Sequence, residues 1–425
     1  MALKRQTQVP VVMAMFLAIM ATAAVAMAGE GAAAGKGPGP VKPELPPDPA
    51  VMKILDALGE NQSAWLPPIR TVGNMGDLVR KFSLDKTGPR TRNYCVKWVW
   101  TPDRKRAIFC GENAGAPHRL NDVWEYDLPS NTWVLLHEPD ADFTRVSAKE
   151  KEDIALVKDG ILTTKTGAPY DPVHSWWQIT YDPEMHALLW VMGNYNKCGF
   201  PHKSQVPWGK LEMFAYHPYE KRWEYFRPDA TSPPGQNASI LEYMPDSRQV
   251  LWFTNSWRGC TTSTFDGQSK AWKELLGKKE IQGNANCPGT EAVAAYDTMN
   301  RILVAHRGGE QHQGKPVPKC TYHYDPAANK WEKVIQSDEG PIGSDAWTSM
   351  TYDSAAGCCY VVDKNLWSYR VGDKKWEKLS PQGPPAPNGM ACYNPDRNVL
   401  MVDSGGGRVW VWRGQKASAP NQDHK

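Results

Sequence analysis

Tyr126-Asp-Leu-Pro-Ser-Asn-Thr-Trp133 and Tyr324-Asp-Pro-Ala-Ala-Asn-Lys-Trp331 share one pattern, in which an aromatic residue precedes a tryptophan by seven positions. The Asp, Pro and Asn residues between them are those that reverse a chain between two strands. The same spacing recurs in three further pairs: Tyr216/Trp223, Phe265/Trp272 and Tyr369/Trp376. Each repeat is therefore predicted to end in a β-hairpin with a large aromatic side chain on both arms.

A second hairpin signal precedes each of these units. It is an alternating strand, a turn like Tyr181-Asp-Pro-Glu184, and an apolar strand like Ala187-Leu-Leu-Trp190. The corresponding aromatics of the six turns are Trp100, Tyr181, Tyr243, Tyr296, Tyr352 and Tyr393. A repeat with four short strands predicts an all-β fold, a six-bladed β-propeller.

The two ends of the repeat region complement each other. The sixth unit stops at Val409-Trp-Val-Trp412 and lacks its outer strand, whereas Asn61-Gln-Ser-Ala-Trp-Leu66 resembles an outer strand without a blade. A closed ring leaves no unpaired edge. We therefore predict that an N-terminal strand around Trp65 completes the last blade.

The pattern resembles kelch repeats of the galactose oxidase central-domain type over roughly Trp65 to Arg413. This resemblance implies four-stranded antiparallel blades around a central channel. The family's double glycine after the second strand is present as Gly308-Gly309 and Gly405-Gly406. It is absent from the third and fifth units, which have Asn255-Ser256 and Asp363-Lys364 at this point.

The N-terminus is typical of an export signal, because Lys4 and Arg5 precede an apolar run that ends in Ala26-Met-Ala28. We expect cleavage after residue 28 and a secreted or periplasmic protein; an uncleaved membrane anchor is the alternative. Residues 1–28 hold two basic and no acidic residues, so the mature chain, out of a total formal charge of +3, is close to neutral. Such a charge gives no reason to expect nucleic acid as a partner.

The remaining boundaries follow from composition. Residues 29–60 are expected to form a flexible linker, residues 61–413 the propeller, and residues 414–425 a polar tail. An insert at about 138–172 interrupts the propeller, and its segment 147–158 favours a short helix.

The chain has 9 cysteines, an odd number, so at least one cannot pair within the chain. Cys95 and Cys110 lie toward the same end of one predicted hairpin, and Cys260 and Cys287 lie in loops that could meet. These are the two candidate disulfides of an exported protein.

Ligands of propellers usually bind at one mouth of the channel, where the inner strands line the wall. We therefore compared the starts of the six inner strands and added one arginine from a neighbouring loop. The candidate ligand-binding residues are His174, Trp176, Asn237, Glu291, Arg307, Asp345, Trp347 and Asn388. Aromatic, amide and carboxylate groups together suit a sugar or another polar ligand; the alternative is that they bind channel water and loop backbone.

Arg307 belongs to the densest titratable cluster outside the insert, together with His306, Glu310 and His312. This cluster could serve as a metal or acid/base site, although exposed loop side chains are the alternative.

We expect a non-enzymatic module that binds a carbohydrate or a protein partner, without a cofactor or metal. The alternative is a carbohydrate-active enzyme. The galactose oxidase resemblance implies copper held by two His and two Tyr, but the histidines are scattered among the repeats. A metal-free mutarotase or lyase, or a glycosidase that uses Glu291 and Asp345, is a further form of this alternative.

Overall fold

The computed structural model describes residues 44–416, apart from 74–75, 83, 85–91, 93, 112–119, 144, 159–160, 171, 173, 193–209, 237, 257–258, 310, 313–314, 317, 338 and 344–347. The predicted signal peptide, residues 29–43 of the predicted linker and residues 417–425 of the predicted tail lie outside the described residues. Among the described residues, no helix has both the length and the apolar character needed to cross a membrane.

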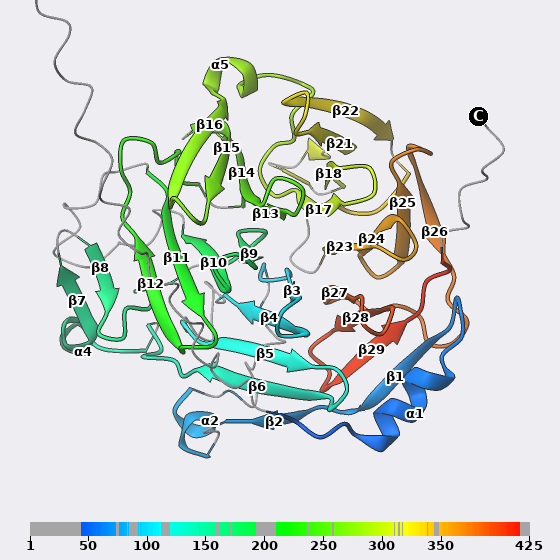
Figure 1. Ribbon diagram of the computed structural model, residues 1–425, viewed down its shortest axis with the longest axis horizontal. Helices are drawn as coiled ribbons and strands as arrows, with labels where there is room; N and C mark the ends of the chain where they lie inside the picture. The colour runs from blue at the N-terminus through cyan, green and yellow to red at the C-terminus, as the bar shows by residue number, and fades with distance from the viewer. Residues whose placement is uncertain are drawn as a thin grey trace, which may run out of the picture. The chain divides into compact units, whose positions relative to one another are not determined.

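Six antiparallel sheets of four or five strands form the blades, and this confirms the six-bladed, all-β propeller. The inner strands of successive blades are β3 (Val99–Thr101), β9 (Ile179–Asp182), β13 (Ile240–Met244), β17 (Val293–Asp297), β23 (Ser349–Asp353) and β27 (Met390–Asn394). Each inner strand contacts the next, and β27 contacts β3, so the ring is closed (Figure 1). We number the blades one to six in this order.

The other strands follow from the inside of each blade outward. The second strands are β4 (Arg106–Cys110), β10 (Ala187–Met192), β14 (Gln249–Ser256), β18 (Ile302–Arg307), β24 (Cys358–Val362) and β28 (Val399–Asp403). The third strands are β5 (Val123–Asp127), β11 (Glu212–His217), β15 (Gly259–Asp266), β21 (Lys319–Asp325), β25 (Leu366–Arg370) and β29 (Arg408–Trp412). The outer strands are β6 (Thr132–His137), β12 (Arg222–Phe226), β16 (Ala271–Leu276), β22 (Lys330–Ser337), β26 (Lys375–Leu379) and, in blade six, β1 (Ser63–Pro68).

The aromatic pairs lie where the spacing predicts them. Tyr324 and Trp331 are directly opposite each other in β21 and β22, with ring centroids 5.1 Å apart. The other four pairs show the same register in blades one, two, three and five. Paired large aromatics on adjacent strands contribute both buried area and favourable ring contacts, so each pair fixes the outer hairpin of its blade.

The turn residues explain why the repeat retains Asp after its aromatic. Asp325 Oδ1 accepts hydrogen bonds from the backbone N–H groups of Ala327 (2.8 Å) and Ala328 (3.1 Å). The turn then ends at Asn329 with a φ of 48°, a left-handed conformation that asparagine tolerates well. The sequence thus encodes the reversal locally, before any packing between blades.

Blade six contains the N-terminal strand. β1 pairs antiparallel with β29, and Trp65 lies opposite Trp410. The register differs from that of the other blades, because Ser63 rather than Trp65 lies opposite Trp412. Trp65 is therefore displaced by two residues from the position predicted for it.

The neighbouring loop explains this displacement. The Ser63 N–H donates to the Gln382 carbonyl (2.9 Å) and its hydroxyl donates to the Pro384 carbonyl (2.7 Å). A Cβ on Gly383 would lie only 2.4 Å from the Ser63 carbonyl oxygen. The space beside Ser63 is occupied by backbone, so an indole does not fit at this position.

Residues 49–57 differ from the expected flexible linker, because they form helix α1 (Pro49–Ala57). Asp48 caps the helix and Pro49 starts it, which are favourable residues at these positions. Val51 and Leu55, four residues apart, are buried against the propeller core. Helix formation here depends on this packing more than on intrinsic propensity. A further strand, β2 (Arg70–Val72), pairs parallel with β6.

The insert after blade one has its own small core of Ala141, Phe143, Leu162 and Tyr170. The predicted helix is shorter than expected: it is α4 (Ala148–Ile154), and the chain continues into a hairpin of β7 (Ala155–Lys158) and β8 (Ile161–Thr164). Its β-branched and leucine-rich sequence favours this strand pair.

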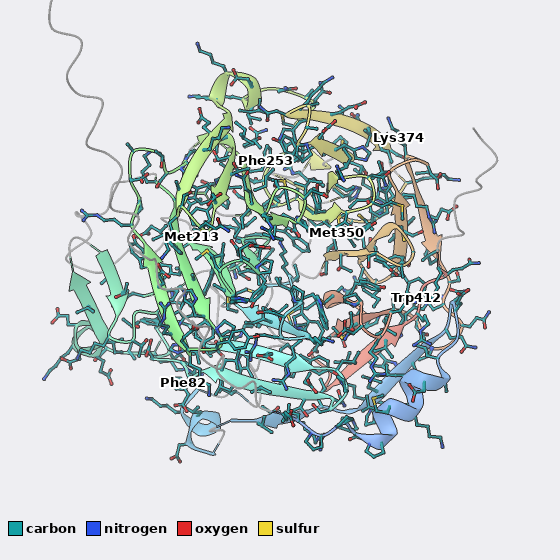
Figure 2. The ribbon with its side chains drawn as sticks, viewed as in Figure 1. Phe82, Met213, Phe253, Met350, Lys374 and Trp412 are labelled. Atoms are coloured by element: carbon teal, nitrogen blue, oxygen red, sulfur yellow. The ribbon has the colours of Figure 1, made fainter. Side chains whose placement is uncertain are left out.

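Short elements complete the fold. They are α2 (Gly76–Phe82), α5 (Lys278–Ile281), β19 (Gln311–His312) and β20 (Lys315–Pro316). Apolar side chains fill the spaces between blades; Phe253 and Met350 belong to the largest of these clusters (Figure 2).

Candidate functional site

The mouth of the channel is defined here as the end of the ring at which the six inner strands begin. Neighbouring inner strands run parallel, as the Lys97–Ala391 and Trp177–Ile240 bridges show. All six therefore begin at the same end of the ring, and the segments that precede them come together there.

The backbone at this mouth is strained in three neighbouring blades. Trp176, Ala238 and Glu291 each lie five residues before the aromatic of their inner strand and have φ values of 44°, 56° and 67°. The backbone N–H of Glu291 donates to the Ala238 carbonyl at 2.6 Å. Left-handed non-glycine residues are costly and concentrate at functional sites. Tyr94, before the inner strand of blade one, also has a positive φ of 58°.

Three aromatic rings gather at the mouth between blades one and two. Tyr94 lies 4.4 Å from Trp176 and 5.1 Å from His174, measured between ring centroids, and His174 lies 5.6 Å from Trp176. The Trp176 N–H donates to the Tyr94 carbonyl at 2.7 Å, which fixes the two segments together. All three side chains are half-buried, so part of this aromatic trio remains accessible to a ligand.

Buried polar atoms without a partner concentrate at the same end. Among the described residues, twelve buried side-chain atoms lack a hydrogen-bond partner, and six of them belong to residues at the start of the inner strands or beside it. These six are Ser175 Oγ, Gln178 Oε1, Gln236 Oε1, Arg307 Nε, Thr348 Oγ1 and Asn388 Oδ1. Buried polar groups are normally satisfied, so such a cluster calls for water or a ligand.

Below the mouth, hydrogen bonds cross the ring between blades that are not neighbours. The Lys97 ammonium of blade one donates to the Leu241 carbonyl of blade three at 2.6 Å and forms an ion pair with Glu242. The Trp177 indole of blade two donates to the Ala294 carbonyl of blade four at 2.8 Å. These contacts give the mouth a floor.

Burial changes the acid–base properties of this floor. It lowers the pKa of Lys97 and raises the pKa of Glu242, while their mutual attraction opposes both changes. Lys97 also lies 5.4 Å from the centre of the Trp177 ring, a cation–π distance. Nothing in the sequence identified these groups as partners.

The structure brings together several of the predicted ligand residues. His174 and Trp176 are in the aromatic trio, Glu291 is a left-handed residue, and Asn388 contributes an unpartnered oxygen. Arg307 ends β18 beside the start of β17. Asn237, Asp345 and Trp347 lie outside the described residues. Sequence reasoning did not select Tyr94, Thr348 or the floor residues as site residues.

His306 is not the exposed loop residue that one interpretation of the titratable cluster suggested. It is buried, and its ring nitrogens bond to Thr321 Oγ1 and the Pro341 carbonyl, both at 2.9 Å. Burial lowers the pKa of His306 to about 4. It is a neutral structural side chain at pH 7, and Glu310 lies outside the described residues.

The four cysteines of the candidate disulfides are buried and free in the structure. Each predicted pair is close enough to interact: the Cys95 thiol contributes to the raised pKa of Cys110, and Cys260 contributes to the raised pKa of Cys287, with burial the larger cause in both. The two disulfides stay predictions.

The described histidines do not fit the copper site that the galactose oxidase resemblance implies. Both ring nitrogens of His306 are occupied, and His323 Nε2 bonds to the Tyr369 hydroxyl at 2.8 Å. Within the described part of the chain, no three His, Cys, Asp or Glu side chains group as metal ligands.

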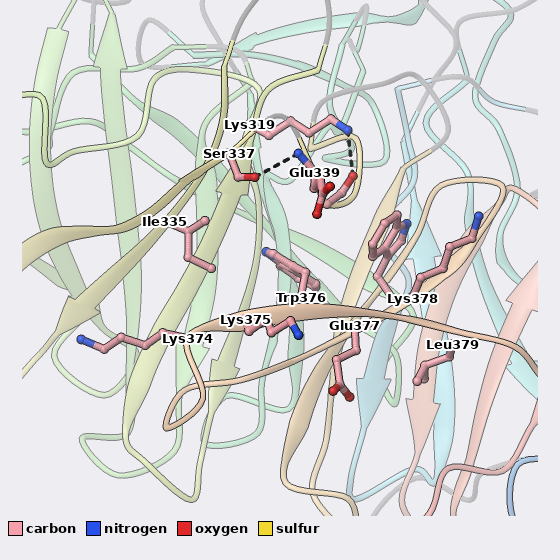
Figure 3. A pocket seen from close by; sticks show the side chains of 12 residues that line it. Lys319, Ile335, Ser337, Glu339, Lys374, Lys375, Trp376, Glu377, Lys378 and Leu379 are labelled. Atoms are coloured by element: carbon pink, nitrogen blue, oxygen red, sulfur yellow. Dashed lines mark hydrogen bonds between the residues drawn. The ribbon is translucent and has the colours of Figure 1, made fainter.

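A groove of about 860 Å³ lies elsewhere, between the outer strands β22 and β26. Trp367, Trp376 and Lys374 are among its lining side chains (Figure 3). The Lys319 ammonium donates to the Gly340 carbonyl at 2.8 Å within it. The groove belongs to the rim of the ring, and the mouth is the site with strained backbone and unpartnered polar atoms.

No family model matches the chain, and no curated protein matches it. Two solved structures are similar. TolB from Acinetobacter baumannii is 12% identical, with a TM-score of 0.38, over 74% of this chain and 65% of that chain. XC5397 from Xanthomonas campestris, described as a gluconolactonase, is 9% identical, with a TM-score of 0.42, over 87% of this chain and 98% of that chain.

Proposed function

We propose that this chain is a binding module that holds a small carbohydrate at the mouth of its propeller. The observation that carries the proposal is the set of six buried, unpartnered polar atoms around the mouth. A sugar offers many hydroxyl groups that both donate and accept hydrogen bonds, so it can satisfy serine, threonine and amide groups at once.

The aromatic trio supports the same ligand class. Half-buried aromatic faces pack against the apolar faces of sugar rings, while neighbouring polar groups fix their orientation. A protein partner would need a larger apolar surface than three half-buried rings, so the small ligand is favoured. Catalysis is not part of the proposal.

Two finer proposals accompany this one. The aromatic pairs, their turns and the double glycines support assignment of the blades to the kelch type. The basic and apolar residues before Gly29 support export to the periplasm or the medium.

The decisive variant is Trp176→Gly. It removes one ring of the trio and relieves a left-handed backbone, which costs about 1–3 kcal/mol for a non-glycine residue. A residue that is strained for binding should lose function without loss of stability. We therefore expect at least a tenfold weaker sugar affinity with an unchanged or higher free energy of unfolding, measured by calorimetry and urea titration.

Trp367→Ala is the matched control, because Trp367 is a half-buried tryptophan of the rim groove. Sugar binding that is lost in Trp367→Ala and kept in Trp176→Gly would place the site in the groove. Absence of binding across a panel of monosaccharides and oligosaccharides would contradict the proposal.

A further inference from the structure

We propose that the ligand of the mouth carries an anionic group, a carboxylate or a phosphate, and that Arg307 binds it. This inference rests on the proposed function and specifies the class of sugar. It depends on the position, packing and missing partner of a single guanidinium.

Arg307 lies at the mouth because of the strand register in blade four. β17 and β18 are antiparallel, and Val293 is opposite His306. The next residue of β18, Arg307, therefore lies beside the segment that leads into β17 and contains Glu291. The guanidinium is thus close to the strained backbone described above.

Two glycine segments enclose this side chain. A Cβ on Gly289 would lie 2.7 Å from Arg307 Nη1, and a Cβ on Gly343 would lie 2.5 Å from Arg307 Cα. The Gly343 N–H donates to the Gly308 carbonyl at 2.8 Å. The loops before blades four and five therefore approach Arg307 in a way that only glycine allows, and they hold its stem in place.

The guanidinium differs from the buried arginines of blade one. Arg92 pairs with Asp122 at 2.6 Å, and Arg106 pairs with Glu125 at 2.9 Å. No carboxylate of the described residues forms an ion pair with Arg307, and its buried Nε has no acceptor. A buried guanidinium N–H without an acceptor is costly, and in this chain the other arginines avoid that cost.

An anionic oxygen is the natural acceptor. The guanidinium presents a planar fork that matches carboxylate and phosphate, and it is always charged. The other groups at the mouth are neutral, apart from Glu291, which opposes an anion. A sugar acid or a sugar phosphate would therefore satisfy Arg307 while its ring and hydroxyls meet the aromatic and amide groups.

The first test uses the wild-type chain and isothermal titration calorimetry. The probes are glucose, galactose and mannose, the corresponding uronates, and the 6-phosphates. We expect at least one uronate or phosphate to bind tenfold or more tightly than its neutral parent, since a charge-assisted hydrogen bond is about twice as strong as a neutral one. The uronate and phosphate arms identify which anion is preferred.

Variants then locate the charge. Arg307→Gln should remove the preference for the anionic probe and leave the affinity for the neutral parent within about threefold, whereas Arg307→Lys should keep part of the preference. Glu291→Gln should strengthen anion binding, because it removes the nearest opposing charge. Lys374→Gln, in the rim groove, is the control that should change nothing.

The outcomes separate the two proposals. Equal binding of neutral and anionic probes overturns this inference and leaves the proposed function standing. An anion preference that is lost in Lys374→Gln but kept in Arg307→Gln also overturns it. Binding of none of the probes overturns both. Should Arg307→Gln fail to fold, the wild-type ratio and Arg307→Lys still decide.

Discussion

Lys97 of blade one reaches across the ring to Glu242 of blade three, and both side chains are almost fully withdrawn from water. The Lys97 ammonium also donates to the Leu241 carbonyl at 2.6 Å. The pair therefore joins two blades that do not otherwise adjoin. Since the attraction must offset the loss of hydration of both charges, the pair is more sensitive to loss of one partner than to loss of both.

Lys97→Met should lower the free energy of unfolding by about 3–5 kcal/mol at pH 7, because it leaves Glu242 buried and unpaired. The loss should be smaller at pH 5, where the raised pKa of Glu242 lets the carboxyl take up a proton. Urea denaturation at both pH values measures this difference.

The double variant Lys97→Met/Glu242→Gln should recover part of the loss, and Lys105→Met is the surface control. Lys105 lies 3.5 Å from Asp396, but both side chains are largely exposed. Its loss should cost about 0–1 kcal/mol. A Lys97→Met protein as stable as this control would show that the ion pair does not connect the blades.

His306 should make stability depend on mildly acidic pH. Its pKa is lowered from 6.5 to about 4 in the folded protein, so the unfolded chain binds a proton in this range and the folded chain does not. Stability from this group is therefore present above pH 6.5 and is lost as pH falls toward 4, by roughly 3 kcal/mol.

The comparison of wild type with His306→Gln isolates this contribution from that of the carboxyl groups. We expect the variant to lose less stability than wild type between pH 7 and pH 4. His186→Gln serves as control, because the His186 side chain is exposed. Parallel pH profiles for wild type and His306→Gln would contradict the assignment of His306 as a buried neutral group.

The blades could be predicted from the sequence because their signals are local. The aromatic of one strand and the tryptophan of the next are separated by a single turn, so spacing alone fixes their register, as Tyr324 and Trp331 show. The same local logic identified the starts of the inner strands, and with them His174, Trp176 and Glu291.

Contacts between distant segments could not be predicted in this way. Lys97 and Glu242 are separated by 145 residues, and no periodicity relates them. The displaced register of Trp65 depends on Gly383 and Gln382, which lie in the loop between blades five and six. Helix α1 was missed because its apolar face is short and gains its stability only by packing on the propeller.

The thiols provide a test of how closed the blades are. Burial raises the pKa of Cys287 and Cys358 to about 12 and that of Cys359 further. Since the thiolate is the nucleophile, we expect these cysteines in the folded protein to react slowly with DTNB at pH 8 and rapidly after unfolding in guanidinium chloride.

Cys198, the one cysteine outside the described residues, is the control position. Any fast-reacting thiol should disappear in Cys198→Ser. A fast thiol that persists in this variant would mean that at least one blade opens under native conditions.

Gly383 tests the role of the N-terminal strand in closing the ring. The residue has a φ of 123°, and an added Cβ would lie 2.4 Å from the Ser63 carbonyl oxygen of β1. Gly383→Ala must therefore displace the strand or strain the loop, and we expect a loss of about 2 kcal/mol or more in the free energy of unfolding.

Gly372→Ala is the matched control, since nothing lies within 4 Å of its added Cβ and its backbone is compatible with alanine. We expect a change within about 0.5 kcal/mol for this variant. If the two variants are equally stable, β1 is not held against the loop between blades five and six, and the ring must be closed by other contacts. If only Gly383→Ala is destabilised, the strand around Trp65 closes blade six, although its register differs from that of the other outer strands.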